Sequence, residues 1–207
     1  MDNLQVFNRF SPTVINTLIE YYRAGGSYDT ATMNKLSIGE MEKLITPVIE
    51  TITNEELSYA NGNFYEHSYP YLPHTDYQPQ HDNTLNVVIP LQYTSALPNL
   101  VVFDQRWEQS SVTWCMHHPV MYFSVNIGIK GCPHEYPSVK NLTGKDIPDD
   151  LARHLVHYPK HCLFGLSGTA YPFTIGSAIL FDNRKIHCTS YFTGVKLGVS
   201  LRYKVHR

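Results

Sequence analysis

The sequence predicts an α+β chain that is mainly β, with helices in its first third and antiparallel strands after them. Two amphipathic stretches lie before about residue 60, and beyond that point short β-branched and aromatic runs alternate with turn residues. This order favours a sandwich or barrel of strands that is buttressed by the N-terminal helices. At 207 residues, with 43% hydrophobic and 16% charged residues, the chain is long enough for one domain with a sizeable core.

Two helices are expected in the N-terminal third. The first spans residues 11–26, where Ser11 is a suitable N-cap, Pro12 suits the first turn and two glycines end the run. The second fits residues 39–52, where apolar residues recur every three or four positions. Pro47 is expected to kink or divide this second helix. Both apolar stripes are interpreted as core-facing.

Short runs rich in β-branched and aromatic residues, bounded by turn residues, are the strand candidates. They are residues 63–71, 84–92, 99–105, 120–127, 177–183 and 196–205. Residues 130–170 are loop-like, with a short helix expected around residues 149–158. We expect residues 1–207 to form a single domain, with a helical buttress at 1–60 and a strand-built core at 61–207 that carries an insert at about 130–170.

Charge and hydropathy exclude several classes of partner. A formal net charge of −2 without a Lys/Arg run argues against a broad nucleic-acid interface. The first ten residues are polar and lack the basic-then-apolar build of a secretory signal, and no apolar run reaches the length of a membrane span. These features predict a soluble, cytoplasmic protein without a membrane partner.

The cysteines are expected to be reduced, because they lie far apart and form no Cys-x-x-Cys pair. They are Cys115, Cys132, Cys162 and Cys188. One alternative is a structural zinc held by ligands from the insert, namely Cys132, His134, His154, His157, His161 and Cys162. Their spacings are irregular for a zinc module, which makes this alternative the weaker one.

A metal site is predicted from three residues far apart in the sequence. Residues 71–78 place His74 and Asp76 one residue apart, and alternate residues of an extended segment point the same way. A polar turn would also explain this pair, which is weak evidence by itself. His187 follows near the far end of an apolar strand that begins at Gly176. Two imidazoles and one carboxylate on one face of an octahedral metal form the triad of non-haem Fe(II) oxygenases.

The last predicted strand supplies a row of polar residues. Lys196, Gly198, Ser200 and Arg202 fall on one face, because side chains alternate along a strand. Such a row faces either solvent or an anion inside the core, and periodicity alone favours neither reading. A metal triad leaves three adjacent positions, two for a 2-oxo acid and one for O2. A dicarboxylate such as 2-oxoglutarate then needs a cation for its far carboxylate, and this strand offers one.

On these residues the chain resembles the Fe(II)/2-oxoglutarate-dependent oxygenase superfamily, over roughly residues 60–205. The resemblance implies the double-stranded β-helix, a jelly roll with N-terminal helices packed outside. It implies Fe(II) held by His74, Asp76 and His187, with 2-oxoglutarate and O2 as co-substrates and ascorbate as an additive that can stimulate turnover. Because Asp76 is retained, hydroxylation is the expected reaction rather than halogenation, since the related halogenases lack this carboxylate.

Two branches of the superfamily share further residues with this sequence. Tyr65 and Tyr71 lie nine and three residues before His74, as two tyrosines do in prolyl hydroxylases. Asn63 and Tyr65 also resemble the Asn-x-Tyr of the AlkB family. The row on the last strand is similar to that family's Arg-x-Asn-x-Thr-x-Arg. The resemblance therefore implies that the co-substrate is bound by Lys196, Arg202, Tyr65, Ser200, Tyr71 and Asn63.

Lys196 is the favoured partner of the far carboxylate, with Arg202 as the rival or as a second anchor. Lys196 lies nine residues after His187, close to the spacing in prolyl hydroxylases, whereas Arg202 lies fifteen residues after it. Lys196 stands where the AlkB row has its first Arg, and Gly198 replaces its Asn. The match to either branch is partial, so the substrate class is not carried over.

Other polar residues fit these patterns less well. Arg106, Trp107 and Arg184 could face a substrate, although surface charge and a half-buried indole explain them better. Cys188 is expected to point away from His187 into the core, and residues 168–173 are interpreted as a mouth loop. Four histidines show no ligand pattern: His67, His81, His117 and His118.

The predicted function is an Fe(II)- and 2-oxoglutarate-dependent oxygenase that hydroxylates a small molecule or a peptidyl side chain and releases succinate and CO2. The alternative is a non-catalytic, cupin-like β-sandwich that binds a metal or ligand and needs no buried cation opposite the metal. An oxygenase acting on nucleic acid is a third reading. The AlkB-like residues suggest it, but the mildly acidic charge and the lack of basic clusters oppose it. The oligomeric state stays open.

Overall fold

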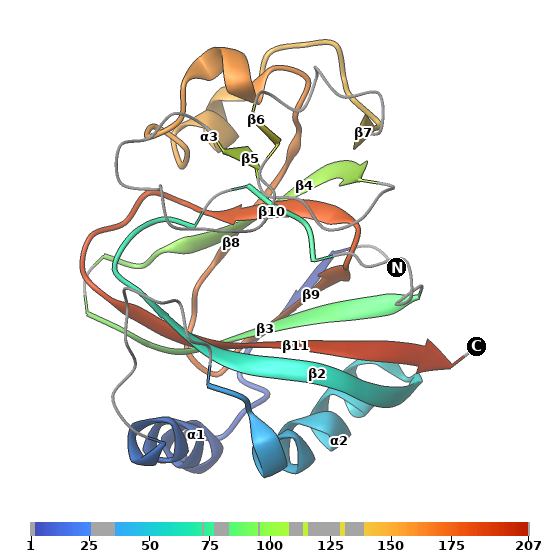
Figure 1. Ribbon diagram of the computed structural model, residues 1–207, viewed down its shortest axis with the longest axis vertical. Coiled ribbons are helices and arrows are strands. Elements are labelled where there is room, and N and C mark those ends of the chain that lie inside the picture. Colours follow the sequence, from blue (N-terminus) through green and yellow to red (C-terminus); the bar gives the residue numbers. More distant parts are fainter. Residues whose placement is uncertain are drawn as a thin grey trace.

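The computed structural model describes residues 3–25, 36–71, 73–76, 83–94, 96–107, 114–115, 129–130 and 139–206. In this part of the chain, helices lie against the outer face of one antiparallel β-sheet, and a second antiparallel sheet faces its inner side (Figure 1). The prediction of a mainly β chain with N-terminal helices packed outside is confirmed. The predicted strand at 120–127 lies outside the described residues.

Both predicted N-terminal helices are present. Helix α1 (Pro12–Ala24) is capped by Ser11, whose hydroxyl accepts a hydrogen bond from the Val14 amide at 3.3 Å. Helix α2 (Glu42–Thr53) follows the short helix η1 (Gly39–Met41) and continues through Pro47, so the expected division does not occur. The turns on either side of Pro47 are anchored by two fully buried isoleucines, which offsets the lost backbone hydrogen bond.

The first sheet carries the helices. Its described strands follow the order β1 (Leu4–Val6), β9 (Ala178–Asp182), β3 (Thr84–Tyr93), β11 (Lys196–His206) and β2 (Glu56–His67), and every neighbouring pair is antiparallel. Alternate residues of these strands form one buried cluster with the apolar faces of α1 and α2. The residues between them point to the other side, toward the second sheet.

The second sheet is built around β4. In the described part of the chain, β4 (Asn99–Trp107) pairs with β10 (Lys185–Thr189) on one side and with β7 (Val139–Lys140) and β8 (Gly168–Pro172) on the other. Its outer face is covered by residues 139–166, which include α3 (Asp149–Ala152) and η4 (Lys160–Leu163). Two short strands, β5 (Trp114–Cys115) and β6 (Ile129–Lys130), pair in parallel.

Several boundaries differ from the prediction. Residues 168–173 are not a mouth loop, because 168–172 form strand β8. Gly168 allows this pairing: a side chain there would collide with the carbonyl oxygen of Val102 on β4. The strand predicted at 63–71 begins earlier and ends earlier, as β2. The helix predicted at 149–158 is shorter and covers only 149–152.

The apolar run toward His187 is not one strand. It divides at Asn183–Arg184 into β9 of the first sheet and β10 of the second. The Arg184 amide donates to Oδ1 of Asp182 at 2.8 Å, which is the local side-chain contact that makes Asp and Asn effective turn residues. The chain thus changes sheets here, and His187 lies on the sheet that faces β2, β3 and β11. None of the helices in the described part of the chain has both the length and the apolar character that crossing a bilayer requires.

Candidate functional site

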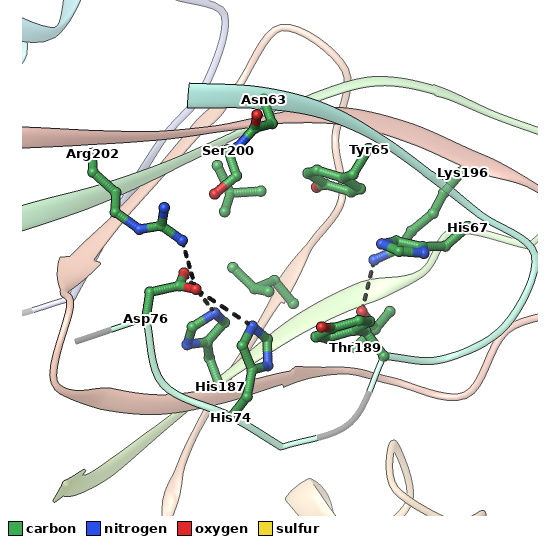
Figure 2. Close-up of a pocket in the computed structure, with 13 residues that line it drawn as sticks. Asn63, Tyr65, His67, His74, Asp76, His187, Thr189, Lys196, Ser200 and Arg202 are labelled. Atoms are coloured by element: carbon green, nitrogen blue, oxygen red, sulfur yellow. Dashed lines mark hydrogen bonds and ion pairs between the residues drawn. The ribbon is translucent and has the colours of Figure 1, made fainter. Parts of the chain in front are cut away.

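A cavity between the two sheets brings all the predicted site residues together (Figure 2). These are Asn63, Tyr65, Tyr71, His74, Asp76, His187, Lys196, Ser200 and Arg202. Four further residues line the same cavity: His67, Val88, Leu100 and Thr189. The metal-binding group lies at one end and Lys196 at the other, and Asn63, Ser200 and Tyr65 line the upper side of the cavity in Figure 2.

Strand pairing explains one wall of the cavity. On β11, Lys196, Gly198 and Ser200 pair with His67, Tyr65 and Asn63 of β2, and alternation turns both rows inward. Lys196 is only 3% exposed. The reading in which this row faces solvent is therefore wrong.

Gly198 has a specific reason to lack a side chain. A Cβ atom at this position would lie 2.5 Å from the Tyr65 hydroxyl and 3.0 Å from the Phe173 ring. The glycine therefore leaves the space in which the Tyr65 ring crosses the last strand. This is a physical reason for glycine at the position where the AlkB-like row has an asparagine.

The chain crosses from one sheet to the other between β2 and the triad. Beyond β2, the Tyr71 carbonyl accepts a hydrogen bond from the Thr189 amide of β10 at 3.2 Å. His74 and His187 then exchange both backbone hydrogen bonds, each at 2.9 Å. Their imidazole centroids lie 4.0 Å apart, so backbone pairing fixes the two histidines as direct neighbours.

Asp76 completes a donor set that could hold a metal ion. Its Oδ2 lies 3.5 Å from Nε2 of His187, and its Oδ1 lies 4.0 Å from Nε2 of His74. One ligand atom from each residue lies within 4.8 Å of the other two. Two imidazole nitrogens and a carboxylate oxygen suit a non-haem iron site with open positions. Among the described residues, no other group of three such side chains comes this close.

Contacts behind the triad fix its orientation. Nδ1 of His187 donates to the Lys185 carbonyl at 3.1 Å, so Nε2, which faces Asp76, is the ring nitrogen that could bind a metal ion. The Tyr71 ring meets the His74 ring edge-on, with centroids 4.6 Å apart. The His187 ring packs on Phe181, with centroids 4.7 Å apart.

The Asp76 carboxylate is held by two donors. Nη2 of Arg202 lies 2.7 Å from Oδ1, and Nδ2 of Asn86 lies 3.0 Å from Oδ2. Nη1 of Arg202 donates to Oδ1 of Asn61 at 2.7 Å. Arg202 is thus engaged at the metal end of the cavity, where it balances the charge of Asp76.

Lys196 occupies the other end. Its Nζ donates to Oγ1 of Thr189 at 2.7 Å and lies 5.2–5.5 Å from the centroids of three aromatic rings, those of Tyr65, Phe173 and Phe192. Among the described residues no carboxylate pairs with it. Burial lowers the pKa of Lys196 to about 7, and the nearby Cys188 thiol opposes that shift only in part. A buried ammonium without a counter-ion is unfavourable, so this position favours an anionic ligand.

Tyr65 lies between the two ends and is also buried. Burial raises the pKa of its phenol well above the usual range, so the hydroxyl stays protonated and can donate a hydrogen bond. Its ring stacks on His67, with centroids 5.4 Å apart. His67 was not assigned a role from the sequence. It lies two residues after Tyr65 on the same strand face, so alternation could have placed it in the same cavity.

The remaining candidates lie elsewhere. Arg106 pairs with Asp182 at 2.9 Å, and both line a separate cavity with Arg184. Trp107 and Cys188 are buried in the outer cluster of the second sheet, which confirms the direction expected for Cys188. Cys162 and Cys188 are free thiols, as expected. The predicted residues that lie outside the described part of the chain are His81, His117, His118, Cys132 and His134.

Comparison with known proteins gives a likeness in fold. The sequence matches no protein-family model and no curated protein. The structure is similar to the non-heme α-ketoglutarate-dependent epimerase SnoN from nogalamycin biosynthesis, with a TM-score of 0.55 and 11% identity over 97% of this chain and 76% of that one. It is also similar to EctD from S. alaskensis, with a TM-score of 0.52 and 13% identity over 98% of this chain and 72% of that one.

A third similar structure is HygX from Streptomyces hygroscopicus with nickel and 2-oxoglutarate bound. Its TM-score is 0.51 and its identity 10%, over 98% of this chain and 82% of that one. SnoN has also been seen with Fe3+ and α-ketoglutarate, and EctD with 2-oxoglutarate and 5-hydroxyectoine. At these identities the likeness shows the fold: the chain has the fold of the iron- and 2-oxoglutarate-dependent enzymes, the superfamily that its sequence motifs resemble.

Proposed function

We propose that this chain is an Fe(II)- and 2-oxoglutarate-dependent oxygenase that hydroxylates a small molecule or a peptidyl side chain and releases succinate and CO2. One observation carries the proposal. A single cavity has a His-Asp-His donor set at one end and a buried lysine, with no carboxylate partner among the described residues, at the other. A 2-oxo dicarboxylate needs these two features, one for each end of the molecule.

The residues that would hold the iron are His74, Asp76 and His187. Their donor set, and the outward hydrogen bond from Nδ1 of His187, fit a divalent metal with open positions. When bound, iron supplies O2 activation and the oxidation of a substrate C–H bond. The protein's part is to orient both substrates and to exclude water and side reactions.

The far carboxylate of 2-oxoglutarate is assigned to Lys196, with the Thr189 hydroxyl beside it. The aromatic rings around Nζ exclude water, which strengthens a charge-assisted hydrogen bond at this position. The protonated Tyr65 hydroxyl, Asn63 and Ser200 are placed along the cavity to donate to the same molecule. Tyr71 lines the same cavity and packs against both His74 and His67.

Arg202 is assigned to the metal end rather than to the far carboxylate. Its guanidinium already holds Asp76 and Asn61. Arg202 and Lys196 are six residues apart on one strand, which separates them by about 20 Å along the backbone. The long arginine side chain reaches Asp76, so it anchors the end of the cavity where the 2-oxo group would bind.

The buried lysine separates this proposal from a cupin-like binding module. A module that only held a metal would have no use for an ammonium buried among aromatic rings opposite the metal, because such a group destabilises the fold unless an anion joins it. An enzyme that binds a dicarboxylate uses that same unfavourable charge for recognition.

Succinate release tests the proposal. The protein supplied with Fe(II), 2-oxoglutarate, O2 and ascorbate should release succinate slowly without its primary substrate, and faster when a substrate is present. His187→Ala is the matched control and should release none. If the iron-loaded parent neither bound nor consumed 2-oxoglutarate, the binding-module alternative would be favoured. A panel of small molecules and peptides, scored by stimulated succinate release, then identifies the substrate class.

A further inference from the structure

Asn86 is a buried polar residue in an otherwise apolar stretch of β3. It is fully buried, and its neighbours along the strand, Leu85, Val87 and Val88, are all in the core. Asparagine is depleted in strands, and a buried amide is unfavourable unless its hydrogen bonds are made. Its Nδ2 lies 3.0 Å from Oδ2 of Asp76. A buried amide thus stands in an apolar strand and donates a hydrogen bond to the carboxylate of the candidate metal site.

We infer that Asn86 is a positioning residue for the metal-binding carboxylate, acting together with Arg202. This inference rests on the proposed function, because it treats Asp76 as a metal ligand. Arg202 fixes Oδ1 at 2.7 Å from one side, and Asn86 fixes Oδ2 from another strand. Two donors on different oxygens set both the position and the plane of the carboxylate.

The orientation of the Asn86 amide follows from chemistry. A carboxylate oxygen only accepts hydrogen bonds, so the amide must present its NH2 group to Asp76 and turn its Oδ1 away. That Oδ1 is buried and has no hydrogen-bond partner among the described residues. An unsatisfied buried acceptor opposes stability. Stability alone therefore does not account for an asparagine here, whereas orientation of Asp76 does.

Asp76 needs such support more than the histidines do. His74 and His187 hold each other through two backbone hydrogen bonds, and His187 lies on a strand. Asp76 lies two residues beyond the bridge at His74 and outside every strand. Its carboxylate is placed by the side chains of Asn86 and Arg202, which both come from the facing sheet.

Metal binding gives the first test. Asn86→Leu removes the donor at similar size, and it should weaken Co(II) and Fe(II) binding about ten- to a hundredfold, as expected for loss of a contact behind a metal ligand. The Co(II) absorption spectrum should also change, because the carboxylate reorients. The control is Val87→Ala, a buried residue on the opposite face of the same strand, which should lower the melting temperature but leave the Co(II) affinity and spectrum unchanged. Parent-like affinity and spectrum in Asn86→Leu would overturn the inference.

A double-mutant cycle on the metal-free protein gives the second test and needs no activity. Asn86→Leu should change stability more favourably in the Asp76→Ala variant than in the parent, because in that variant the amide has lost its partner and only its burial penalty remains. An equal change in stability in both backgrounds would show that Asn86 does not act through Asp76 and would refute the inference. Asn86→Ala replaces the leucine variant if the latter does not fold. If the parent bound no metal, the proposed function would fail, while the cycle would still decide whether Asn86 acts through Asp76.

Discussion

Replacing the buried Lys196 by methionine should weaken 2-oxoglutarate binding without lowering the stability of the metal-free protein. A hydrogen bond to a charged group contributes about 1.5–3 kcal/mol, and 1.4 kcal/mol corresponds to one decade in affinity. Among the described residues, Lys196 is the one cation that contacts Thr189 and the three aromatic rings at this end of the cavity. The affinity for 2-oxoglutarate should therefore fall by roughly ten- to a hundredfold.

The metal-free Lys196→Met protein should unfold no more easily than the parent. The substitution removes a buried ammonium that no described carboxylate neutralises and places an apolar side chain of similar length among three aromatic rings. The assay combines anaerobic titration of 2-oxoglutarate into the Fe(II) protein with thermal unfolding of the metal-free form. Lys204→Met is the matched control, because Lys204 is on the same strand but exposed, and both quantities should stay at the parent's values.

Arg202→Met tests which of the two cations, Lys196 or Arg202, binds the far carboxylate of 2-oxoglutarate. Because Arg202 holds Asp76, its loss should weaken metal binding more than it weakens the contact to the far carboxylate. If Arg202→Met abolished 2-oxoglutarate binding at saturating metal while Lys196→Met had no effect, the assignment of the two ends of the cavity would be reversed.

Further predictions concern Gly198 and pH. Gly198→Ala places a methyl group 2.5 Å from the Tyr65 hydroxyl, so it should destabilise the fold by about 1–3 kcal/mol and weaken 2-oxoglutarate binding, both measured as above; parent-like values would contradict the close packing described. The pKa of Lys196 falls from 10.5 to about 7 on folding, so the unfolded chain binds more protons between these values. The parent should therefore gain stability relative to Lys196→Met as pH rises from about 7 toward 10. Its affinity for 2-oxoglutarate should fall over the same range, because binding then requires proton uptake by the neutral amine; a flat pH profile would contradict this.

The period of two along strands made much of the cavity predictable from the sequence. Asn63, Tyr65 and Tyr71 were predicted through their resemblance to motifs of two oxygenase branches, and the row from Lys196 to Arg202 by alternation; the structure places them all around one cavity. Spacing alone leaves their roles untested. The two helices and most strands were also predicted, because their apolar periodicity is strong.

What the sequence did not reveal depends on contacts between distant segments. The change of sheet at Asn183–Arg184 was missed because the apolar run on both sides is continuous. The strand at Gly168–Pro172 was missed because its pairing depends on the neighbouring β4 backbone rather than on its own pattern. Asn86 could have been noticed as a lone amide in an apolar strand, but its partner Asp76 is known only from the fold.

The central claim is that one cavity binds a metal and 2-oxoglutarate together. Anaerobic addition of 2-oxoglutarate to the Fe(II)-loaded protein tests it most directly, because chelation of Fe(II) by a 2-oxo acid produces a visible charge-transfer absorption. The parent should develop this absorption in proportion to bound 2-oxoglutarate. His74→Ala, Asp76→Ala and His187→Ala should not develop it, although they keep a folded core. Equal absorption in the parent and in all three variants, or none in the parent at saturating metal and 2-oxoglutarate, would contradict the account.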